Sequence, residues 1–462
     1  MADKQNSDNG SDLTALESKA DLIDWMAAGC KPVQDWRIGT EHEKFGYHTN
    51  SLKPLAYDGP DGIRAMLEGL MAYGWQGKYE GETLVALSRP PEAGGGSVTL
   101  EPGGQLELSG APLETIHQTC QEVNGHLKEV QAVAEKLGQS YMGIGFSPQW
   151  GLPDAPQMPK GRYRLMTDYM PKQGNRGLEM MYLSATVQVN LDFGSEADMV
   201  EKLKISLALQ PLATALFANS PFKDGQPTGH LSERSLVWLD TDPARTGMLP
   251  FVFEDGFGFE QYVDYALDVP MYFIVRDGHF INALGMSFRD FMRGALPALP
   301  GEKPTPQDWE DHLTTLFPEA RVKRFIEMRG ADSGPWRSLC ALPAFWVGLL
   351  YDADTQSRVM ALVQDWSVAE MQTLRRQAPV TGLATPFRGG TLHDVAVDVL
   401  ALADNGLQAR GKSDGAGADE RIFLRPLREI VESGKSPAEN LLAQYHDDWD
   451  RDIRQIFKTC AF

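Results

Sequence analysis

The sequence predicts an α+β fold in which helices cover one face of a sheet and the other face is polar. Residues 183–191 carry apolar side chains at every odd position and polar side chains at every even position, which is typical of a strand with one buried face. Residues 112–138 place apolar residues at helical spacing between a first-turn proline and a final glycine, which indicates an amphipathic helix. We expect this helix to cover the buried face of the sheet.

Three further segments share the strand alternation and carry charged residues on the polar face. These residues are Glu41 and Glu43 in residues 37–46, Glu101 and Glu107 in residues 99–108, and Glu327 and Arg329 in residues 325–330. Side chains two positions apart in a strand point to the same side. If the segments are neighbouring strands, their polar faces form one surface, the polar floor, which also includes Gln188 and Asn190. For Glu41 and Glu43 taken alone, a polar strand face in water is the alternative.

Crowded carboxylates on the polar floor would need protons or cations. Two unit charges about 4 Å apart interact by roughly 4 kcal/mol at an effective dielectric constant near 20. Oxygen ligands without a His or Cys pattern favour Mg²⁺ or Mn²⁺, and the Gln188 carbonyl can add a ligand without adding charge. The guanidinium of Arg329 matches carboxylate and phosphate groups in a bidentate way. Together these features indicate nucleotide chemistry with a divalent metal.

The length and charge of the chain limit the class of protein to which it can belong. The 462 residues carry a net charge of −20 with a pI near 4.9, which argues against non-specific nucleic-acid binding. No apolar run approaches the roughly 20 residues that a membrane span needs, so we expect a soluble cytoplasmic protein. Residues 1–12 are polar, without the pattern of a signal peptide or an Arg-rich transit sequence, and are expected to be a disordered tail. We expect residues 13–462 to form a single catalytic domain with a helix-rich C-terminal part.

The four cysteines and three polar loops are the remaining local features of the sequence. Cys30, Cys120, Cys340 and Cys460 are too widely spaced for a metal or redox motif, so we expect four free thiols in a reducing compartment. Gly94, Gly95 and Gly96 either approach a phosphate or form a mobile hairpin loop. The basic loop at residues 161–176 either contacts an anion or is solvated. Arg234 either binds a substrate carboxylate or pairs with Asp240 or Asp242 to order its loop.

Five segments of the sequence resemble the glutamate–cysteine ligase family of the plant and proteobacterial type. They are GTEHEKFG at residues 39–46, LEPGGQLELSG at 100–110, VQVN at 187–190, EMRGAD at 327–332 and CALPAFW at 340–346. The matches are spread from about residue 13 to the end of the chain. The resemblance implies a fold related to the catalytic part of glutamine synthetase, with a curved, mainly antiparallel sheet forming a funnel and helices packed outside. The one-sided strands agree with that architecture.

The resemblance also implies a reaction, the first step of glutathione biosynthesis. The enzyme would join the γ-carboxyl of L-glutamate to the amine of L-cysteine with ATP and Mg²⁺, through a γ-glutamyl phosphate. Metal ions would neutralise charge that repels the attacking carboxylate. The implied metal ligands are Glu41, Glu43, Glu101, Glu107, Gln188 and Glu327. Arg234 and Arg329 would hold the glutamate carboxylate or the transferring phosphoryl group, with Asn190 as a further substrate-binding residue.

Some consequences of the resemblance stay open at this point. Plant members are regulated through disulfides, but no cysteine lies close to Cys340 in the sequence. We expect small molecules as partners, neither nucleic acid nor membrane, and a monomer or a homodimer. One alternative function is another ATP-dependent ligase with a glutamate donor and a different amine. The other is a non-catalytic protein that binds a divalent metal.

Overall fold

The computed structural model describes residues 14–462, so the tail expected over residues 1–12 lies outside the described residues. The centre of the fold is a nine-stranded sheet with strand order β14-β15-β7-β1-β5-β4-β3-β2, and β6 pairs with the second half of β1. All of its strand pairs are antiparallel. The strands are β1 (Ile38–His48), β2 (Gln76–Glu80), β3 (Thr83–Ser88), β4 (Ser97–Leu100), β5 (Leu106–Ser109), β6 (Gln139–Met142), β7 (Thr186–Leu191), β14 (Ala320–Val322) and β15 (Ile326–Asp332).

Helices surround this sheet, and four short two-stranded ladders lie outside it. The helices are α1 (Lys19–Ala27), α2 (Ile63–Leu70), α3 (Ile116–Leu137), α4 (Gly161–Tyr169), α5 (Gly177–Leu183), α6 (Glu196–Leu216), α7 (Glu233–Val237), α8 (Phe259–Asp268), α9 (Phe288–Met292), α10 (Pro306–Thr314), α11 (Trp336–Leu350), α12 (Ala353–Val363), α13 (Val368–Thr381), α14 (Leu392–Arg410), α15 (Arg425–Ser433), α16 (Pro437–Asp447) and α17 (Ile456–Thr459). The ladders pair β8 (Phe222–Lys223) with β9 (Gln226–Pro227), β10 (Thr246–Gly247) with β13 (Phe317–Pro318), β11 (Phe273–Arg276) with β12 (His279–Asn282), and β16 (Pro386–Phe387) with β17 (Gly390–Thr391).

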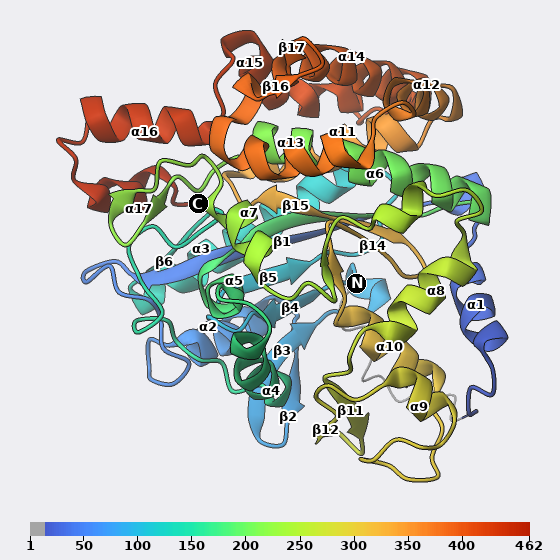
Figure 1. Cartoon of the computed structure of the whole chain (residues 1–462). Helices are drawn as coiled ribbons and strands as arrows, with labels where there is room; N and C mark the ends of the chain where they lie inside the picture. The colour runs from blue at the N-terminus through green and yellow to red at the C-terminus, as the bar shows by residue number, and fades with distance from the viewer. Residues whose placement is uncertain (1–13) are drawn as a thin grey trace.

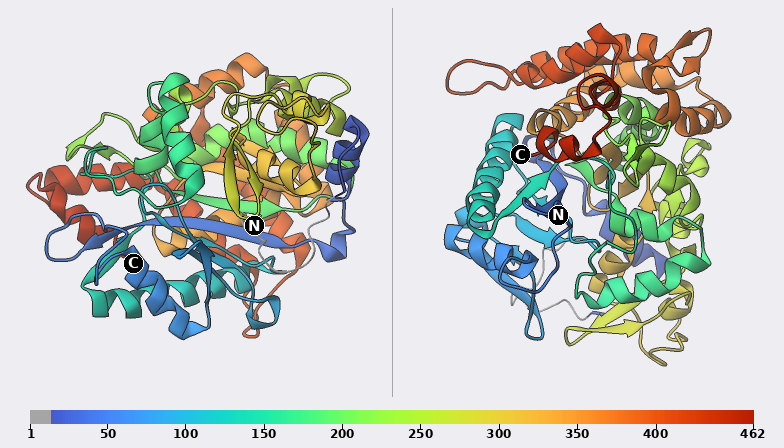
Figure 2. Two further views of the ribbon diagram at one scale, coloured as in Figure 1. Left: turned by 90° about the horizontal axis from the view of Figure 1, so that it is seen from below. Right: turned by 90° about the vertical axis from the view of Figure 1, so that its left-hand side faces the viewer.

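The arrangement confirms the predicted α+β class with a mainly antiparallel sheet. Figure 1 shows α6, α11, α13 and α14 stacked above the sheet, and Figure 2 shows the long strand β1 crossing the molecule. Helix α6 contacts β15, and α11 contacts β7, α3 and α14. The edge strands β14 and β2 do not pair with each other in the described part of the chain, so the sheet is open.

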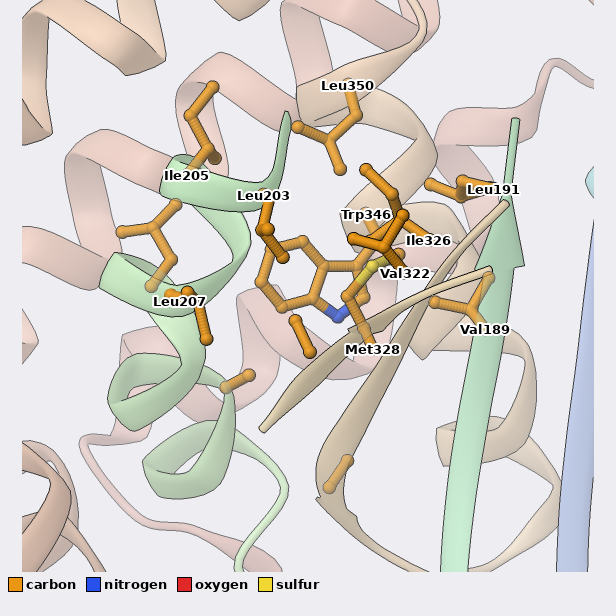
Figure 3. Close-up of a cluster of buried hydrophobic side chains, with 14 of the residues drawn as sticks. Val189, Leu191, Leu203, Ile205, Leu207, Val322, Ile326, Met328, Trp346 and Leu350 are labelled. Carbon is orange, nitrogen blue, oxygen red and sulfur yellow. The ribbon is translucent and has the colours of Figure 1, made fainter. Parts of the chain in front are cut away.

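The apolar face of β7 lies in the core, as its alternation predicts. Figure 3 shows Trp346 of α11 between Leu203 of α6 and the strand residues Val189 and Met328. All four side chains are buried. Burial of an aliphatic side chain of this size contributes roughly 1.5–3 kcal/mol. These contacts hold β7 and β15 against the helical layer, which leaves their opposite faces for polar residues.

The helix predicted over residues 112–138 is α3, which begins four residues later than the proline. The Thr115 hydroxyl accepts a hydrogen bond from the Gln118 backbone N–H at 3.2 Å and caps the first turn. Gly138 ends the helix in the left-handed conformation at φ 65°. Because a side-chain cap satisfies a free N–H group, Thr115 rather than Pro112 sets the start of the helix.

The segment 99–108, predicted as one strand, is instead two strands joined by a turn. Strand β4 ends at Leu100 and β5 begins at Leu106, and the Gly104 N–H donates to the Glu101 carbonyl at 2.9 Å. Gly104 has a φ of 79°, which favours glycine and reverses the chain. Glu101 therefore lies in a turn at the end of the floor and not on a strand face.

Two other loop predictions have different outcomes. The expected basic loop at residues 161–176 begins with helix α4, whose Tyr163 and Tyr169 side chains are buried. The expectation of a loop there is wrong, because these aromatic residues occur at helical spacing among the charges. By contrast, residues 94–96 do lie in the connection between the antiparallel strands β3 and β4, as a hairpin loop requires.

Two of the four cysteines form a disulfide, so the expectation of four free thiols is wrong. Helix α3 packs on α11, and this contact brings Cys120 and Cys340 together with a Cα–Cα distance of 5.6 Å despite a sequence separation of 220 residues. Cys30 and Cys460 carry free thiols. The spacing of cysteines in the sequence reveals local motifs but not pairs made by tertiary packing.

Among the helices within residues 14–462, none combines the length and the apolar character needed to cross a membrane.

Candidate active site

Neighbouring strands bring the predicted polar residues together on one face of the sheet. Glu43 lies opposite Glu107, Glu41 opposite Gln188, and Glu327 opposite Asn190. Directly opposed residues on antiparallel strands share a face. All six side chains are buried. The structure therefore assembles the polar floor across β5, β1, β7 and β15, with Glu101 beside it in the β4–β5 turn.

The acidic half of the site consists of Glu43 and Glu107 on the floor and Glu101 in the adjoining turn. Burial, and then the charges of Glu101 and Glu107, raise the pKa of Glu43 well above its usual value. Burial, followed by Glu101 and Glu41, raises the pKa of Glu107 to about 8. The Thr99 hydroxyl donates to Glu107 Oε2 at 2.5 Å, and the Thr186 N–H donates to Glu43 Oε2 at 3.1 Å. Burial and the neighbouring carboxylates therefore favour the protonated forms of Glu43 and Glu107.

The donor set of the acidic half fits a hard divalent cation. Clustered carboxylate oxygens are the ligands that Mg²⁺ and Mn²⁺ prefer, and a bound cation would remove the repulsion that raises these pKa values. In this conformation, no three His, Cys, Asp or Glu side chains within residues 14–462 are arranged to hold a metal ion. Metal binding would therefore require these side chains to rotate toward the ion.

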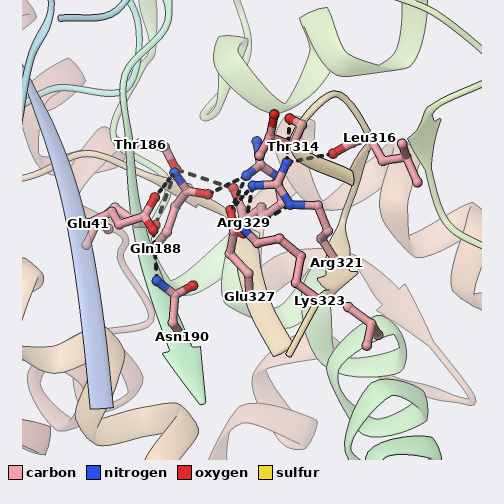
Figure 4. A network of polar contacts seen from close by, with 12 residues as sticks. Glu41, Thr186, Gln188, Asn190, Thr314, Leu316, Arg321, Lys323, Glu327 and Arg329 are labelled. Atoms are coloured by element: carbon pink, nitrogen blue, oxygen red, sulfur yellow. Dashed lines mark hydrogen bonds and ion pairs between the residues drawn. The ribbon is translucent and has the colours of Figure 1, made fainter. Parts of the chain in front are cut away.

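The other part of the floor, the basic half, surrounds Glu327 with Arg321, Lys323 and Arg329. Arg321 donates from Nε and Nη2 to Glu327 at 2.7–3.0 Å, Arg329 donates from Nη1, and Lys323 Nζ lies 3.8 Å from Oε2 (Figure 4). Burial alone would raise the pKa of Glu327, but Arg321 and Arg329 hold it far below its usual value. Glu327 therefore keeps its negative charge, whereas burial and neighbouring carboxylates favour the protonated forms of Glu43 and Glu107.

Sequence reasoning missed Arg321 and Lys323. They alternate with the apolar residues Ala320 and Val322, and this pattern is the only sequence feature that points to them. Strand β14 is three residues long, which is too short for the alternation to stand out. Their position follows from the pairing of β14 with β15, which places Arg321 opposite Glu327.

Amide side chains join the two halves. Asn190 Nδ2 donates to Glu41 Oε1 at 2.8 Å, and Gln188 Nε2 donates to Glu41 Oε2 at 3.3 Å. Gln188 Oε1 accepts from Arg329 Nη1 at 2.8 Å, so this one residue touches an acid and a base (Figure 4). The amides hold Glu41 in place from the neighbouring strand.

Arg234 lies on α7, above the floor and not on a strand. The side chain is buried, and its Nη2 donates to the Arg329 backbone carbonyl at 2.8 Å. The alternative of a loop-ordering pair is wrong, because Asp240 accepts from Asn175 and Asp242 pairs with Arg245. Burial lowers the pKa of Arg234 somewhat, but arginine keeps its charge in proteins. A buried guanidinium held this way can bind an anion.

A small cavity of about 20 Å³, the Arg234 cavity, lies between α7 and the floor. Its wall includes Arg234, Trp238, Phe317, Glu319 and Arg329. Arg329 also belongs to the floor, so the cavity adjoins the basic half. Two guanidinium groups, a carboxylate and two aromatic rings suit a small charged organic molecule.

The comparisons with known proteins agree on one family. Residues 37–459 match glutamate-cysteine ligase family 2 (GCS2). The chain is 56% identical over 446 residues to the glutamate–cysteine ligase of Brassica juncea, covering 96% of this chain and 84% of the relative. It is 54% identical over 451 residues to glutamate–cysteine ligase B of Oryza sativa subsp. japonica, covering 97% of this chain and 88% of the relative.

A solved structure shares the fold. The crystal structure of glutamate–cysteine ligase from Francisella tularensis in complex with AMP superposes with a TM-score of 0.54 at 12% identity. The alignment covers 93% of this chain and 89% of that one. At this identity, the likeness concerns the arrangement of the sheet and helices alone.

The names of the plant relatives correct the expected location. The relatives from Brassica juncea, Medicago truncatula and Arabidopsis thaliana are all named chloroplastic. This finding contradicts the cytoplasmic location that we expected from composition. A net negative charge keeps a protein soluble in any aqueous compartment, so it does not identify one.

Proposed function

The chain belongs to the glutamate–cysteine ligase family and joins glutamate to cysteine to give γ-glutamylcysteine, and we propose that it does so with ATP and Mg²⁺ through a γ-glutamyl phosphate. The observation that carries this mechanism is the polar floor, where buried carboxyl groups with raised pKa values adjoin three basic side chains. Metal-bound nucleotide phosphates and a phosphoryl-transfer site need that combination. Strands β7 and β15 of the floor pack with α11 and α14 into one core, which supports a single catalytic domain over residues 13–462.

The chemistry explains why both halves are needed. A carboxylate does not react with an amine, because its oxygen is too poor a leaving group. A γ-carboxylate oxygen therefore attacks the γ-phosphorus of ATP, and ADP leaves. The neutral amine of cysteine then attacks the carbonyl carbon, phosphate leaves, and a proton is lost from nitrogen. Negative charge gathers at the phosphoryl group, where groups preorganised to receive it lower the barrier.

The acidic half would hold the metal. The proposed ligands are Glu43, Glu101 and Glu107, with Glu41, Gln188 and Glu327 completing the set. A bound divalent cation would neutralise phosphate charge that repels the attacking carboxylate. The acidic half fits this role best, because burial and neighbouring carboxylates raise the pKa values of Glu43 and Glu107, and a bound cation would stabilise their charged forms. Glu327 would join the set only by loosening its pairs with Arg321 and Arg329.

The basic side chains have separate proposed roles. Arg321, Lys323 and Arg329 lie together around Glu327 and would bind the transferring phosphoryl group. Arg234, which faces the adjoining cavity, would bind a carboxylate of glutamate. Asn190 donates to Glu41 and would act on the substrate through that carboxylate, by fixing its orientation.

Release of ADP tests the requirements of this reaction. Wild-type protein with ATP, Mg²⁺ and glutamate should release ADP in step with product when cysteine is added, and much less with a panel of other amines. Glu43→Gln should keep the fold and lose Mg²⁺-dependent ADP release. Glu114→Gln, an exposed carboxylate paired with Lys412, is the matched control and should retain it. Near wild-type turnover of Glu43→Gln at limiting Mg²⁺ would remove Glu43 from the site.

Isotope transfer tests the intermediate. When glutamate carries ¹⁸O in its γ-carboxyl group, the acyl-phosphate route delivers one labelled oxygen to the released phosphate. Unlabelled phosphate formed while γ-glutamylcysteine accumulates would refute that route, whatever the identity of the metal.

A further inference from the structure

Asp332 is a buried carboxylate at the last position of β15, and it accepts three hydrogen bonds. Its Oδ2 accepts from the Asn219 backbone N–H at 2.8 Å and from the Ser220 hydroxyl at 2.6 Å. Its Oδ1 accepts from the Ser232 hydroxyl at 2.8 Å. Hydrogen bonds to an ionised acceptor are stronger than those between neutral groups. Asp332 therefore ties the loop after α6 and the loop before α7 to the central sheet.

The two serines bound by this carboxylate supply acceptors to the first turn of α7. Helix α7 has five residues, and a helix this short is not stable by itself. Its first N–H groups have no acceptor within the helix. The Ser220 carbonyl accepts from the Glu233 N–H at 3.0 Å, and the Ser220 hydroxyl accepts from the Arg234 N–H at 3.3 Å. The Ser232 hydroxyl accepts from the Ser235 N–H at 3.2 Å and caps the helix.

The side chain of Arg234 is attached to the same strand. Helix α7 contacts β15 (Figure 1), and Arg234 Nη2 donates to the backbone carbonyl of Arg329 at 2.8 Å. Burial lowers the pKa of Arg234, and the charge of Asp332 opposes that effect more than any other charge. Burial raises the pKa of Asp332, and the charge of Arg234 opposes it in turn. The two buried charges therefore stabilise each other.

We propose that Asp332 is a positioning residue for Arg234, which fixes α7 on β15 through Ser220 and Ser232 and so holds the guanidinium in the orientation that substrate binding requires. The inference rests on the proposed function, in which Arg234 binds a carboxylate of glutamate. It deepens that function by adding a residue that acts on the substrate only through Arg234.

The variant Asp332→Asn removes the charge while keeping the size of the side chain. A carboxylate accepts hydrogen bonds at both oxygens, whereas an amide accepts at one oxygen only. Either Ser232 or the Ser220 side of the network therefore loses its acceptor, and the start of α7 moves. A displacement of about 1 Å in a substrate-binding group can cost on the order of a hundredfold in rate. We expect kcat/KM for glutamate to fall by about ten- to a hundredfold, through KM, while the KM of ATP and kcat change little.

A double-mutant cycle separates positioning from a purely structural role. If Asp332 acts through Arg234, its effect on the KM of glutamate disappears once Arg234 is replaced. Arg234→Met should raise the KM of glutamate, and adding Asp332→Asn should raise it no further. A purely structural carboxylate predicts instead that the two effects multiply and that the KM of ATP rises as well.

Variants of Ser232 provide a graded effect and its rescue. Ser232→Ala removes one of the three hydrogen bonds to Asp332 together with the cap of α7. It should raise the KM of glutamate, by less than Asp332→Asn does. Ser232→Thr keeps a hydroxyl group that can both donate and accept, so it should restore the wild-type value.

The chain offers a matched control in Asp308→Asn. Asp308 is also a buried carboxylate at the start of a helix, α10. It accepts from the Thr305 N–H at 2.8 Å and from the Thr305 hydroxyl at 2.9 Å, and it pairs with Arg276. It does not line the Arg234 cavity. Asp308→Asn should lower the free energy of unfolding in urea, as Asp332→Asn should, but leave the KM of glutamate unchanged.

The outcomes separate the proposal from its premise. If Arg234→Met keeps the wild-type KM of glutamate, the proposed role of Arg234 fails, and the positioning role fails with it. If Arg234→Met raises this KM but Asp332→Asn does not, or if the two effects multiply, only the role of Asp332 is overturned. Formation of γ-glutamylcysteine without release of ADP would refute the proposed mechanism, and the cycle in the KM of glutamate would still decide the role of Asp332. If Asp332→Asn does not fold, Ser232→Ala takes its place in the cycle.

Discussion

Replacing Glu107 with glutamine should stabilise the metal-free protein, and more so as the pH rises. The pKa of this buried carboxyl group is raised from 4.5 to about 8, first by burial and then by Glu101 and Glu41. Between these two pH values the unfolded state binds fewer protons than the folded state, so the wild-type protein loses stability as the pH increases. The loss approaches 1.4 kcal/mol per pH unit. Glutamine cannot ionise, so the variant avoids this loss.

The size of the stability difference follows from the width of the pH range between the two pKa values. From pH 5 to pH 7, the stability of Glu107→Gln relative to wild type should grow by about 2–3 kcal/mol. Urea unfolding in the presence of a chelator, at several pH values, measures the difference directly. Glu114→Gln, on the surface, should show no such trend. Saturating Mg²⁺ should stabilise the wild type but not the variant, because only the wild type keeps the full set of metal ligands.

Two results would refute this reasoning. A difference between variant and wild type that stays constant from pH 5 to pH 7 would mean that Glu107 is ionised in the folded protein without a metal. A stabilising effect of Mg²⁺ that is equal in both proteins would mean that Glu107 does not contribute to the metal site. The first result would leave the fold of the floor intact but remove the argument that burial and neighbouring carboxylates disfavour the charged form of Glu107.

Three further changes test other parts of the structure. Arg329→Met should lower turnover by about two to four powers of ten in steady-state kinetics, the scale of single charge-stabilising groups. Arg321→Met should lower the free energy of unfolding by about 3–5 kcal/mol, because it removes a cation that pairs with the buried Glu327 carboxylate. Adding Glu327→Gln to this variant should restore part of the lost stability, which a double-mutant cycle measures. Cys120→Ser should lower the free energy of unfolding by about 2–5 kcal/mol. Reductant should cause a similar loss in the wild type and none in the variant. If the wild type melts at the same temperature with and without reductant, the Cys120–Cys340 bond contributes nothing to stability.

Strand patterns account for most of what the sequence predicts correctly. The alternation around Gln188 is local and uninterrupted, so it identifies both the strand and the side that each residue faces. Glu327 is identified in the same way, because it lies between the apolar residues Ile326 and Met328. Glu41 and Glu43 share a face through their spacing of two, although His42 and Lys44 on the other face are also polar. The pairing of β1 with β5 and β7, and of β7 with β15, then brings the carboxylates together.

The failures have physical causes that a local pattern does not contain. Glu101 and the floor residue Glu107 are both at odd positions, so a continuous strand would place them on the same face. Pro102 and the two glycines after it instead turn the chain between these residues. The Cys120–Cys340 pair depends on the packing of α3 against α11, which closes a separation of 220 residues. Glu319 and Trp238 lie in or beside short elements whose sequences are too short to show a hydrophobic periodicity. Their approach to one cavity is a property of the tertiary fold alone.

The placement of the two arginines explains how one site could treat two anions differently. Arg329 lies on the floor beside Glu327 and Gln188, whereas Arg234 is on α7 and donates to the backbone carbonyl of Arg329. A phosphoryl group at the floor would therefore meet Arg329 together with Arg321, while a carboxylate in the cavity would meet Arg234. If Arg234 binds the α-carboxylate, Arg234→Met should raise the KM of glutamate and leave that of ATP unchanged. An equal rise in both constants would mean that Arg234 serves the phosphoryl group and that the floor and the cavity form a single anion site.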